Sequence, residues 1–248
     1  MGALTHDTLR VPRPLAAGLI AVVIGLVTAA CGDSRDLQAP NPGPGAGLRF
    51  SHPTRITNPW LPLSVRRCAE FRGVDDGRQA RSVRRLLPTT HTFTIAGQRA
   101  RAAIVEDRSY EGGLLREVAL DHYAQADDGT VYYLGEDVDY YERGRVVSHE
   151  GAFRYGRDTR ALGVAMPARP LAGQRFAIED ISGQGSEHNT VTRRVAHVAV
   201  SGGIYRDVVQ IDGWVLPDRE HEVKLYGRGV GLLTERGPGA NKQLVGCR

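Results

Sequence analysis

The sequence has little of what marks a nucleic-acid-binding protein. Lysine occurs only at positions 224 and 242, so nearly all of the 32 basic residues are arginines, and the net formal charge is only +4. The arginines are scattered along the chain, whereas nucleic-acid binding needs basic residues clustered on one stripe. The densest group, RQARSVRR at 78–85, is interpreted as a solvated strand edge. We therefore expect no nucleic-acid partner.

The chain also lacks the short motifs of common catalytic and cofactor sites. It contains no GxSxG or P-loop, and the glycines at 227–231 lack the spacing and following helix of a dinucleotide-binding turn. Its histidines at 122, 149, 188, 197 and 221 show no HxH or HxxxH spacing, and the DDGT at 127–130 lacks the alternating acids of a calcium loop. We therefore expect no metal, no cofactor and a non-enzymatic protein.

The first thirty residues have the three zones of an export signal. Residues 1–13 are polar and carry Arg10 and Arg13 against the single acid Asp7. Residues 14–27 (PLAAGLIAVVIGLV) form an apolar run, and small side chains follow at 28–32. A cationic start, a short apolar middle and a small-residue end are typical of a secretory signal. The apolar run is short for a membrane span, which needs about 20 residues.

Cys31 indicates which kind of signal this is. The TAAC at 28–31 resembles the lipobox of bacterial lipoproteins, although Leu is usual where Thr28 stands. The resemblance implies cleavage before Cys31, a diacylglycerol on its thiol and a further acyl group such as palmitate on its amine. Two or more acyl chains, at ~0.8 kcal/mol per buried methylene, anchor a protein stably. We expect a lipid-anchored protein on the extracytoplasmic side of the cell membrane; the alternatives are an ordinary secretory signal or an uncleaved span.

The segment after Cys31 is too poor in apolar bulk to form a core. Residues 32–47 (GDSRDLQAPNPGPGAG) are rich in Pro and Gly and are interpreted as a tether with a reach of roughly 20–25 Å. The sequence thus divides into a lipoprotein signal peptide (1–30), an acylated Cys with a flexible tether (31–49) and a single β-rich domain (50–248).

Two further cysteines lie near the two ends of this domain. An even pair in an oxidising compartment is normally a disulfide, so we expect Cys68 and Cys247 to be bonded. The bond would fasten the carboxy terminus to an early strand, and closing so long a loop is worth on the order of 5 kcal/mol in the chain-entropy model. The alternative is a reactive thiol with a histidine partner.

Within the domain, helical periodicity never persists for ten residues, while period-two segments recur between turn signals. This pattern predicts an all-β fold with little helix, an antiparallel meander that forms a half-barrel, a barrel or a sandwich. The expected strands are 100–110, 114–126, 131–141, 145–155, 175–181, 190–200, 206–216, 220–226 and 231–235.

Several segments resemble an uncharacterised family of bacterial exported proteins and lipoproteins. That family carries an NP-aromatic-xPL motif near the start of the domain and a DWYAQDxxGNVWYxGE-like hairpin. The corresponding segments here are NPWLPL at 58–63 and DHYAQADDGTVYYLGE at 121–136, followed by SHEGA at 148–152, GVAMPA at 163–168 and YGRGVGLL at 226–233. His122 stands where Trp is usual, and Ala126 where Asp is usual. The resemblance spans the domain but implies no activity.

The hairpin at 121–136 holds the candidate ligand-lining residues. Asp121, Tyr123 and Gln125 are expected to share one face of their strand, and Tyr132 and Glu136 one face of the next. An acid, an amide and tyrosines on paired faces are suited to a polar-lipid or glycan groove. The alternative is cross-strand tyrosine packing with acids on the solvent side. A third interpretation pairs Glu136 with Glu150 for glycoside hydrolysis, which requires a fixed separation across a cleft.

Tethering and a curved sheet together favour a binding or carrier module for a lipid or another amphipathic envelope molecule. This expectation rests on the analogy that curved exported sheets often enclose an apolar cavity. The alternative is a structural or protein-interaction module of the cell envelope.

Overall fold

The computed structural model describes residues 47–181 and 185–247. The predicted signal peptide, Cys31 and residues 31–46 of the predicted tether lie outside the described residues. In the described part of the chain the regular structure is entirely β and antiparallel, which confirms the predicted all-β meander.

The strands form two meanders, and within each meander every strand pairs with the next one in the sequence. The first meander contains β1 (Cys68–Asp75), β2 (Arg78–Ile95), β3 (Gln98–Glu111), β4 (Leu114–Gln125), β5 (Val131–Glu142) and β6 (Arg145–Ser148). The second contains β9 (Arg175–Ile181), β10 (Gly185–Val200), β11 (Gly203–Leu216), β12 (Glu220–Gly227), β13 (Gly231–Arg236) and β14 (Ala240–Gly246). The short strands β7 (Phe153–Arg154) and β8 (Gly163–Met166) both pair with β5.

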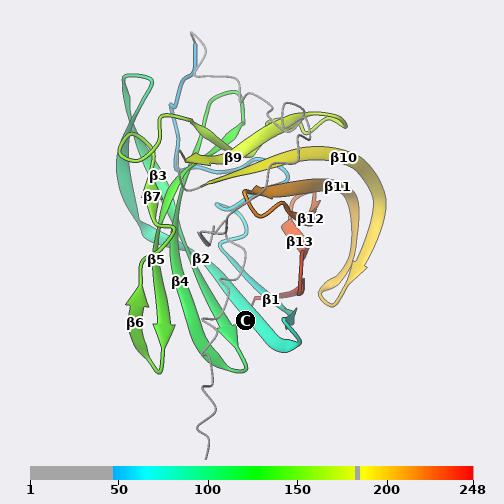
Figure 1. The fold of residues 1–248 in the computed structure, drawn as a ribbon. Coiled ribbons are helices and arrows are strands. Elements are labelled where there is room, and N and C mark those ends of the chain that lie inside the picture. Colours follow the sequence, from blue (N-terminus) through cyan, green and yellow to red (C-terminus); the bar gives the residue numbers. More distant parts are fainter. Residues whose placement is uncertain (1–46, 182–184, 248) are drawn as a thin grey trace, which may run out of the picture.

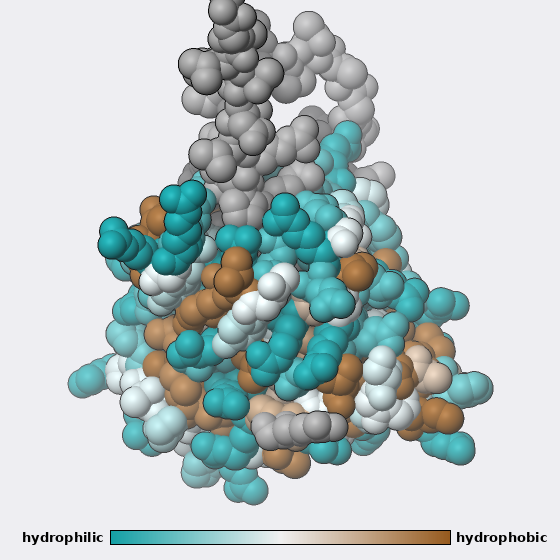
Figure 2. All heavy atoms as spheres, turned by 90° about the horizontal axis from the view of Figure 1, so that it is seen from below, coloured by the Kyte–Doolittle hydropathy of each residue, from teal (hydrophilic) through white to brown (hydrophobic). Residues whose placement is uncertain are grey.

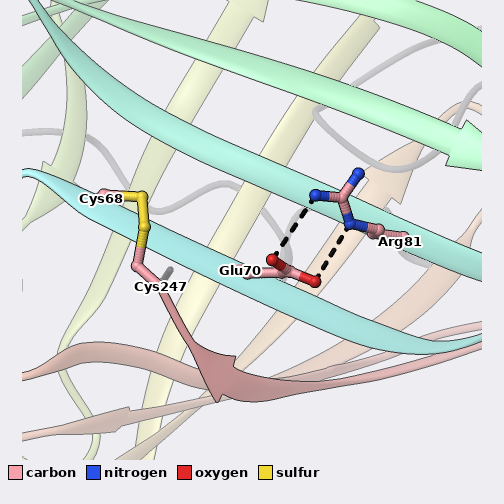
Figure 3. Close-up of a disulfide and its surroundings, with 4 residues drawn as sticks. All are labelled: Cys68, Glu70, Arg81 and Cys247. Atoms are coloured by element: carbon pink, nitrogen blue, oxygen red, sulfur yellow. Dashed lines mark hydrogen bonds and ion pairs between the residues drawn. A yellow bond between two sulfur atoms is a disulfide. The ribbon is translucent and has the colours of Figure 1, made fainter.

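The two meanders join through β1 and β14, the first and last strands in the sequence. β1 pairs with β14 along most of its length, and Cys68 is disulfide-bonded to Cys247 with a Cα–Cα distance of 5.8 Å. This separation is in the ordinary range for a disulfide, so the predicted bond is confirmed. Figure 3 shows it beside the ion pair of Glu70 with Arg81, whose Nε donates to the carboxylate at 3.0 Å. The carboxy terminus is thus held on the first strand.

The sheet curls strongly but is not closed into a barrel. In Figure 1, β4 and β5 lie on one side of the curl and β10 to β13 on the other. Within the described residues the strand ladder ends at β9. The remaining gap is filled by β8, whose Gly163 passes so close to the Ile178 carbonyl of β9 that no side chain would fit there. We call this contact of β8 with β9 the seam.

Most of the expected strands are present, with two differences. The predicted 145–155 strand is interrupted after β6 and resumes only as β7. The strands β1, β8 and β14 and most of β2 have no counterpart among those predicted. The omission of β14 matters most, because β14 and not 231–235 is the last strand in the sequence, and it pairs with β1.

The basic group at 78–85 is not a solvated strand edge, as its charge had suggested. It begins β2, which lies inside the sheet between β1 and β3. Alternate arginines therefore face opposite sides. Arg84 points into the curl, where its Nε donates to Asp107 at 2.5 Å, while Arg81 pairs with Glu70 on the outer face.

Two apolar clusters stabilise the fold. The larger includes Ile56, Leu134, Met166 and Val191, and the smaller gathers around Phe71 and Leu233. On the face seen in Figure 2, hydrophilic residues are interspersed with smaller hydrophobic areas. Burial of apolar area, at roughly 25 cal/mol per Å², is therefore concentrated in these two clusters.

The NPWLPL segment fastens the chain entry to the end of the sheet. The buried Asn58 amide donates to the carbonyls of Gly129 (2.9 Å) and Pro167 (3.0 Å), and its Oδ1 accepts from the Trp60 amide. The Trp60 ring is buried between the guanidinium groups of Arg194 and Arg228, at 5.1 and 5.2 Å from its centroid. The motif thus holds separate loops together.

Candidate functional site

Asp121 and Glu136 lie directly opposite each other on β4 and β5, and Tyr123 lies opposite Tyr133. One residue of β4, His122, therefore lies opposite two of β5, Leu134 and Gly135, which is a β-bulge. Gly135 makes the bulge feasible: its φ is 111°, and a side chain there would collide with the Phe153 carbonyl of β7. The bulge puts Tyr133, not Tyr132, on the same face as Glu136.

The structure therefore separates the predicted residues into three places. Asp121, Tyr123 and Glu136 face the interior of the curl, and the Tyr133 hydroxyl donates to Asp121 at 2.9 Å. Tyr132 lies on the opposite face against Phe50, with ring centroids 5.9 Å apart. Gln125 accepts the backbone amides of residues 57 and 58, so it binds the chain entry. The expectation that Tyr132 and Glu136 share a face is wrong because of the bulge.

The acids of this hairpin are not on the solvent side. Asp121 is 5% exposed and Glu136 is 0% exposed. They belong to a larger set of buried carboxyls that face the interior from both meanders, which we call the carboxyl cluster: Asp107, Glu117, Asp121, Glu136, Glu179, Glu187, Glu222 and Glu235. The interior beside this cluster is charged rather than apolar, unlike the cavity expected for a carrier that encloses lipid chains.

Three cations enter the carboxyl cluster. Lys224 lies 3.0 Å from Glu187 and 2.8 Å from Glu222, Arg84 bonds Asp107, and Lys242 approaches Glu235 at 3.8 Å. Burial alone would lower the pKa of Lys224, but these two glutamates more than offset it and hold the pKa above its ordinary value. Burial would raise the pKa of Glu235, yet Lys242, Lys224 and Arg84 lower it overall.

The carboxyls farther from these cations remain protonated at higher pH. Burial, with a smaller contribution from the neighbouring Asp107, raises the pKa of Asp121 to about 7. Burial raises the pKa of Glu117 to about 8. It also raises the pKa of Glu136 well above its ordinary value, with a further contribution from Glu179. A buried carboxyl without a paired cation is expected to be neutral.

The geometry gives no support to a hydrolytic pair of Glu136 and Glu150. Glu136 is completely buried, whereas Glu150 is exposed, so the two do not flank one cleft. Among residues 47–181 and 185–247, no group of three or more His, Cys, Asp or Glu side chains is arranged to hold a metal ion. In the same residues no helix is long and apolar enough to cross a membrane.

A pocket of about 460 Å³ opens at one end of the seam. Its walls come from the start of the described chain (47–49), the β4–β5 loop, the end of β8 and the start of β9. Tyr132, Val164 and Phe176 give it an apolar side. The volume is in the range of small-molecule sites, about 300–1,000 Å³, and we call it the entry pocket because the chain enters the domain there.

Arginines give the entry pocket a positive rim. Arg49, Arg169 and Arg175 line it, together with two aspartates of the β4–β5 loop. Both aspartates accept hydrogen bonds from neighbouring groups. Asp127 accepts from the amide and the hydroxyl of Ser51 at 2.8 and 2.7 Å. Asp128 accepts from the amide and the hydroxyl of Thr130. The pocket lining therefore combines apolar walls with exposed guanidinium groups.

The predicted ligand-lining residues contribute only Tyr132 to the entry pocket. The rest of the pocket comes from segments that lie far apart in the sequence, so no local spacing could have revealed it. The GVAMPAR and AGQRF stretches at 163–169 and 172–176 were the available signals, since each contains an arginine beside a small or apolar residue.

A scan against protein-family models, a search of curated proteins and a search of solved structures each found no match to this chain. The fold and the two features above are therefore the basis for assigning a function.

Proposed function

We propose that the protein is a membrane-anchored lipoprotein whose domain binds an amphipathic envelope molecule with an anionic headgroup in the entry pocket. The acyl anchor on Cys31 would hold the domain beside the bilayer on the extracytoplasmic side. The ligand class is that of an anionic glycerophospholipid. The binding site is the pocket and not the interior of the sheet.

The observation that supports this proposal is where the chain enters the domain. Gly47, Leu48 and Arg49 line the pocket themselves. They are also bonded to the sheet, since the Gln98 side chain donates to the Leu48 carbonyl and the Asp127 amide to the Arg49 carbonyl. A tether of sixteen residues from Cys31 therefore ends at the pocket, so an anchor at Cys31 brings the pocket toward the membrane.

The chemistry of the pocket matches the two parts of such a ligand. Guanidinium groups bind phosphate through charge-assisted hydrogen bonds, and Arg49 and Arg169 are exposed at the rim. Tyr132 and Phe176 offer aromatic surface to the acyl portion. Leu171 is an exposed apolar side chain in the turn that leads to Gln174 of the pocket.

The direct test is lipid binding by a chain that begins at Gly32 and so has no anchor of its own. Dihexanoyl phosphatidylglycerol below its micellar concentration is titrated calorimetrically, with dihexanoyl phosphatidylcholine as the uncharged comparison. We expect the anionic lipid to bind more tightly. Arg169→Glu is expected to weaken its binding about tenfold or more, because a hydrogen bond to a charged group is worth roughly 1.5–3 kcal/mol.

The matched control is Arg206→Glu, an exposed arginine on β11 outside the pocket. It makes the same charge change and is expected to leave binding unaltered. Equal affinity for the two lipids, or equal effects of the two substitutions, would contradict the proposal.

A further inference from the structure

The seam joins two walls of the entry pocket. Tyr132 and Val164 stand on the β5 and β8 side, and Phe176 stands on the β9 side. One hydrogen bond across it is from the Thr159 hydroxyl to the Asp180 carbonyl, at 2.8 Å. Movement of β9 away from β8 would therefore pull the pocket apart.

Strands on both sides of this seam carry carboxyls of the cluster. Glu136 follows Tyr132 by four residues along β5, and Glu179 follows Phe176 by three along β9. Glu179 is paired in register with Glu187 of β10. Neither oxygen of Glu136 has a hydrogen-bond partner within the described residues, because the Tyr133 hydroxyl donates to Asp121 instead.

Charged and titratable groups surround Glu136 and Glu179 from every neighbouring strand. They are Arg84 of β2, Asp107 of β3, Glu117, Asp121 and Tyr123 of β4, Tyr133 and Tyr140 of β5, Glu187 of β10, Glu222, Lys224 and Tyr226 of β12, Glu235 of β13 and Lys242 of β14. The cations Arg84, Lys224 and Lys242 have their closest ion pairs with other acids. Glu136 therefore meets more carboxyls than cations.

Burial raises the pKa of Glu179 well above its ordinary value, and the adjacent Glu187 raises it further. Glu136 is shifted in the same direction, first by burial and then by Glu179 itself. Both groups are therefore neutral while the seam is closed. Water that reached them would return their pKa values toward the ordinary 4.5 and let both ionise.

We propose that ionisation of Glu136 and Glu179 opens the seam between β8 and β9 and so makes the entry pocket pH-responsive. The pocket is complete when the two carboxyls are protonated. When they are ionised, their mutual repulsion and hydration separate the Tyr132 and Phe176 walls and place negative charge behind an anionic ligand. Ligand release at higher pH rests on the proposed function, whereas the opening itself does not.

The size of the effect follows from proton linkage. The closed form holds two protons that the open form releases, so the opening equilibrium constant rises by up to about tenfold per pH unit for each carboxyl. The increase begins above the ordinary carboxyl pKa of 4.5 and ends once the pH passes the raised values of the closed form.

Hydrogen exchange on the full chain in detergent micelles measures the opening directly. After correction for the intrinsic pH dependence of exchange, protection of peptides from β8 and β9 is expected to fall at least tenfold between pH 5 and 8, while β1 to β3 keep theirs. In Glu136→Gln/Glu179→Gln, protection of β8 and β9 is expected to stay constant. The single variant Glu179→Gln gives the same readout with half the pH dependence if the double variant does not fold.

The matched control is Glu142→Gln, an exposed acid at the end of β5, which should keep the wild-type pH dependence. Constant protection of β8 and β9 in the wild type, or an equal fall in all strands, would overturn the proposed opening. Phosphatidylglycerol binding is measured separately at pH 5. If phosphatidylglycerol binds but the protection of β8 and β9 does not change with pH, only the pH-dependent opening is refuted. If the protection changes with pH but the lipid does not bind, only the proposed ligand is refuted.

Discussion

Asp121 and Glu136 face each other across adjacent strands with both carboxyls buried inside the sheet. Two carboxylates at such a position repel each other and lose their hydration, so at least one proton is retained. The hydroxyl of Tyr133 donates a hydrogen bond to Asp121. This bond stabilises the ionised form of Asp121, so Asp121 loses its proton more readily than Glu136. The interior of the sheet therefore contains carboxyls whose protonation depends on their burial.

The first prediction concerns stability against pH. Because burial raises the pKa of Asp121 from 3.8 to about 7, its protonated form is favoured by folding. That contribution is fully present below pH 3.8 and is lost as the pH rises through about 7. The free energy of unfolding, measured with urea between pH 4 and 8, should fall with rising pH. In Asp121→Asn the slope should be smaller by roughly 1 kcal/mol per pH unit between pH 4 and 7.

Asp218→Asn, in an exposed turn, is the control for the loss of one negative charge. It should leave the slope unchanged. A wild-type chain whose stability rises with pH over this range would show that the interior carboxyls are ionised in the folded state.

Lys224 is predicted to be essential for the second meander. Its ammonium group neutralises Glu187 and Glu222 at 3.0 and 2.8 Å, and removing one partner of a buried ion pair typically costs about 3–5 kcal/mol. Lys224→Met should lower the free energy of unfolding by that order at pH 8 and by less at pH 5, where the two glutamates can take up protons. Arg206→Met, an exposed cation on the adjacent strand, should have little effect at either pH.

Asn58 is predicted to stabilise the chain entry. Its side chain bonds two carbonyls and one amide from three segments, and leaving such groups unpaired costs about 1–3 kcal/mol. Asn58→Ala should lower the urea midpoint and increase proteolysis before β1, whereas Asn241→Ala on the exposed part of β14 should do neither. Equal midpoints for the two variants would mean that water replaces the lost bonds.

The disulfide is predicted to contribute strongly because it closes a long loop. Cys68 and Cys247 are 179 residues apart, for which the chain-entropy model gives on the order of 5 kcal/mol as an upper value. In a chain that begins at Gly32, a thiol reductant should lower the urea midpoint of the wild type. It should have no effect on Cys68→Ser/Cys247→Ser. An unchanged wild-type midpoint would show that the bond is not formed.

Much of the fold could be predicted because alternation along each strand reports which face is buried. The strands β3 and β4 follow this rule over most of their length. The pattern fails for β1 and β2, whose many arginines hide the alternation, since Arg84 and its neighbours point to opposite sides of an internal strand. The pattern also fails at Leu134–Gly135, because the β-bulge there reverses which side chains of β5 face the interior. Nothing in the amino-acid composition of the strand marks this reversal.

The candidate site was harder to predict for a different reason. The expectation of an apolar interior assigned charged side chains to the solvent side, whereas β12 carries Glu222 and Lys224 inward on alternate positions. Charges at period two were the available signal for a buried ionic cluster. The entry pocket depends on contacts among four distant segments, which one sequence does not specify.

The most direct test of the central proposal is to identify where an anionic lipid touches the full chain in its membrane. The membranes are loaded with a photoactivatable phosphatidylglycerol, irradiated, and the protein is digested and mapped by mass spectrometry. Cross-links are predicted at 126–132, 164–169 and 174–176, and they should decrease in Arg169→Glu but not in Arg206→Glu. Cross-links confined to other surfaces, or none beyond the anchor at Cys31, would contradict the proposal.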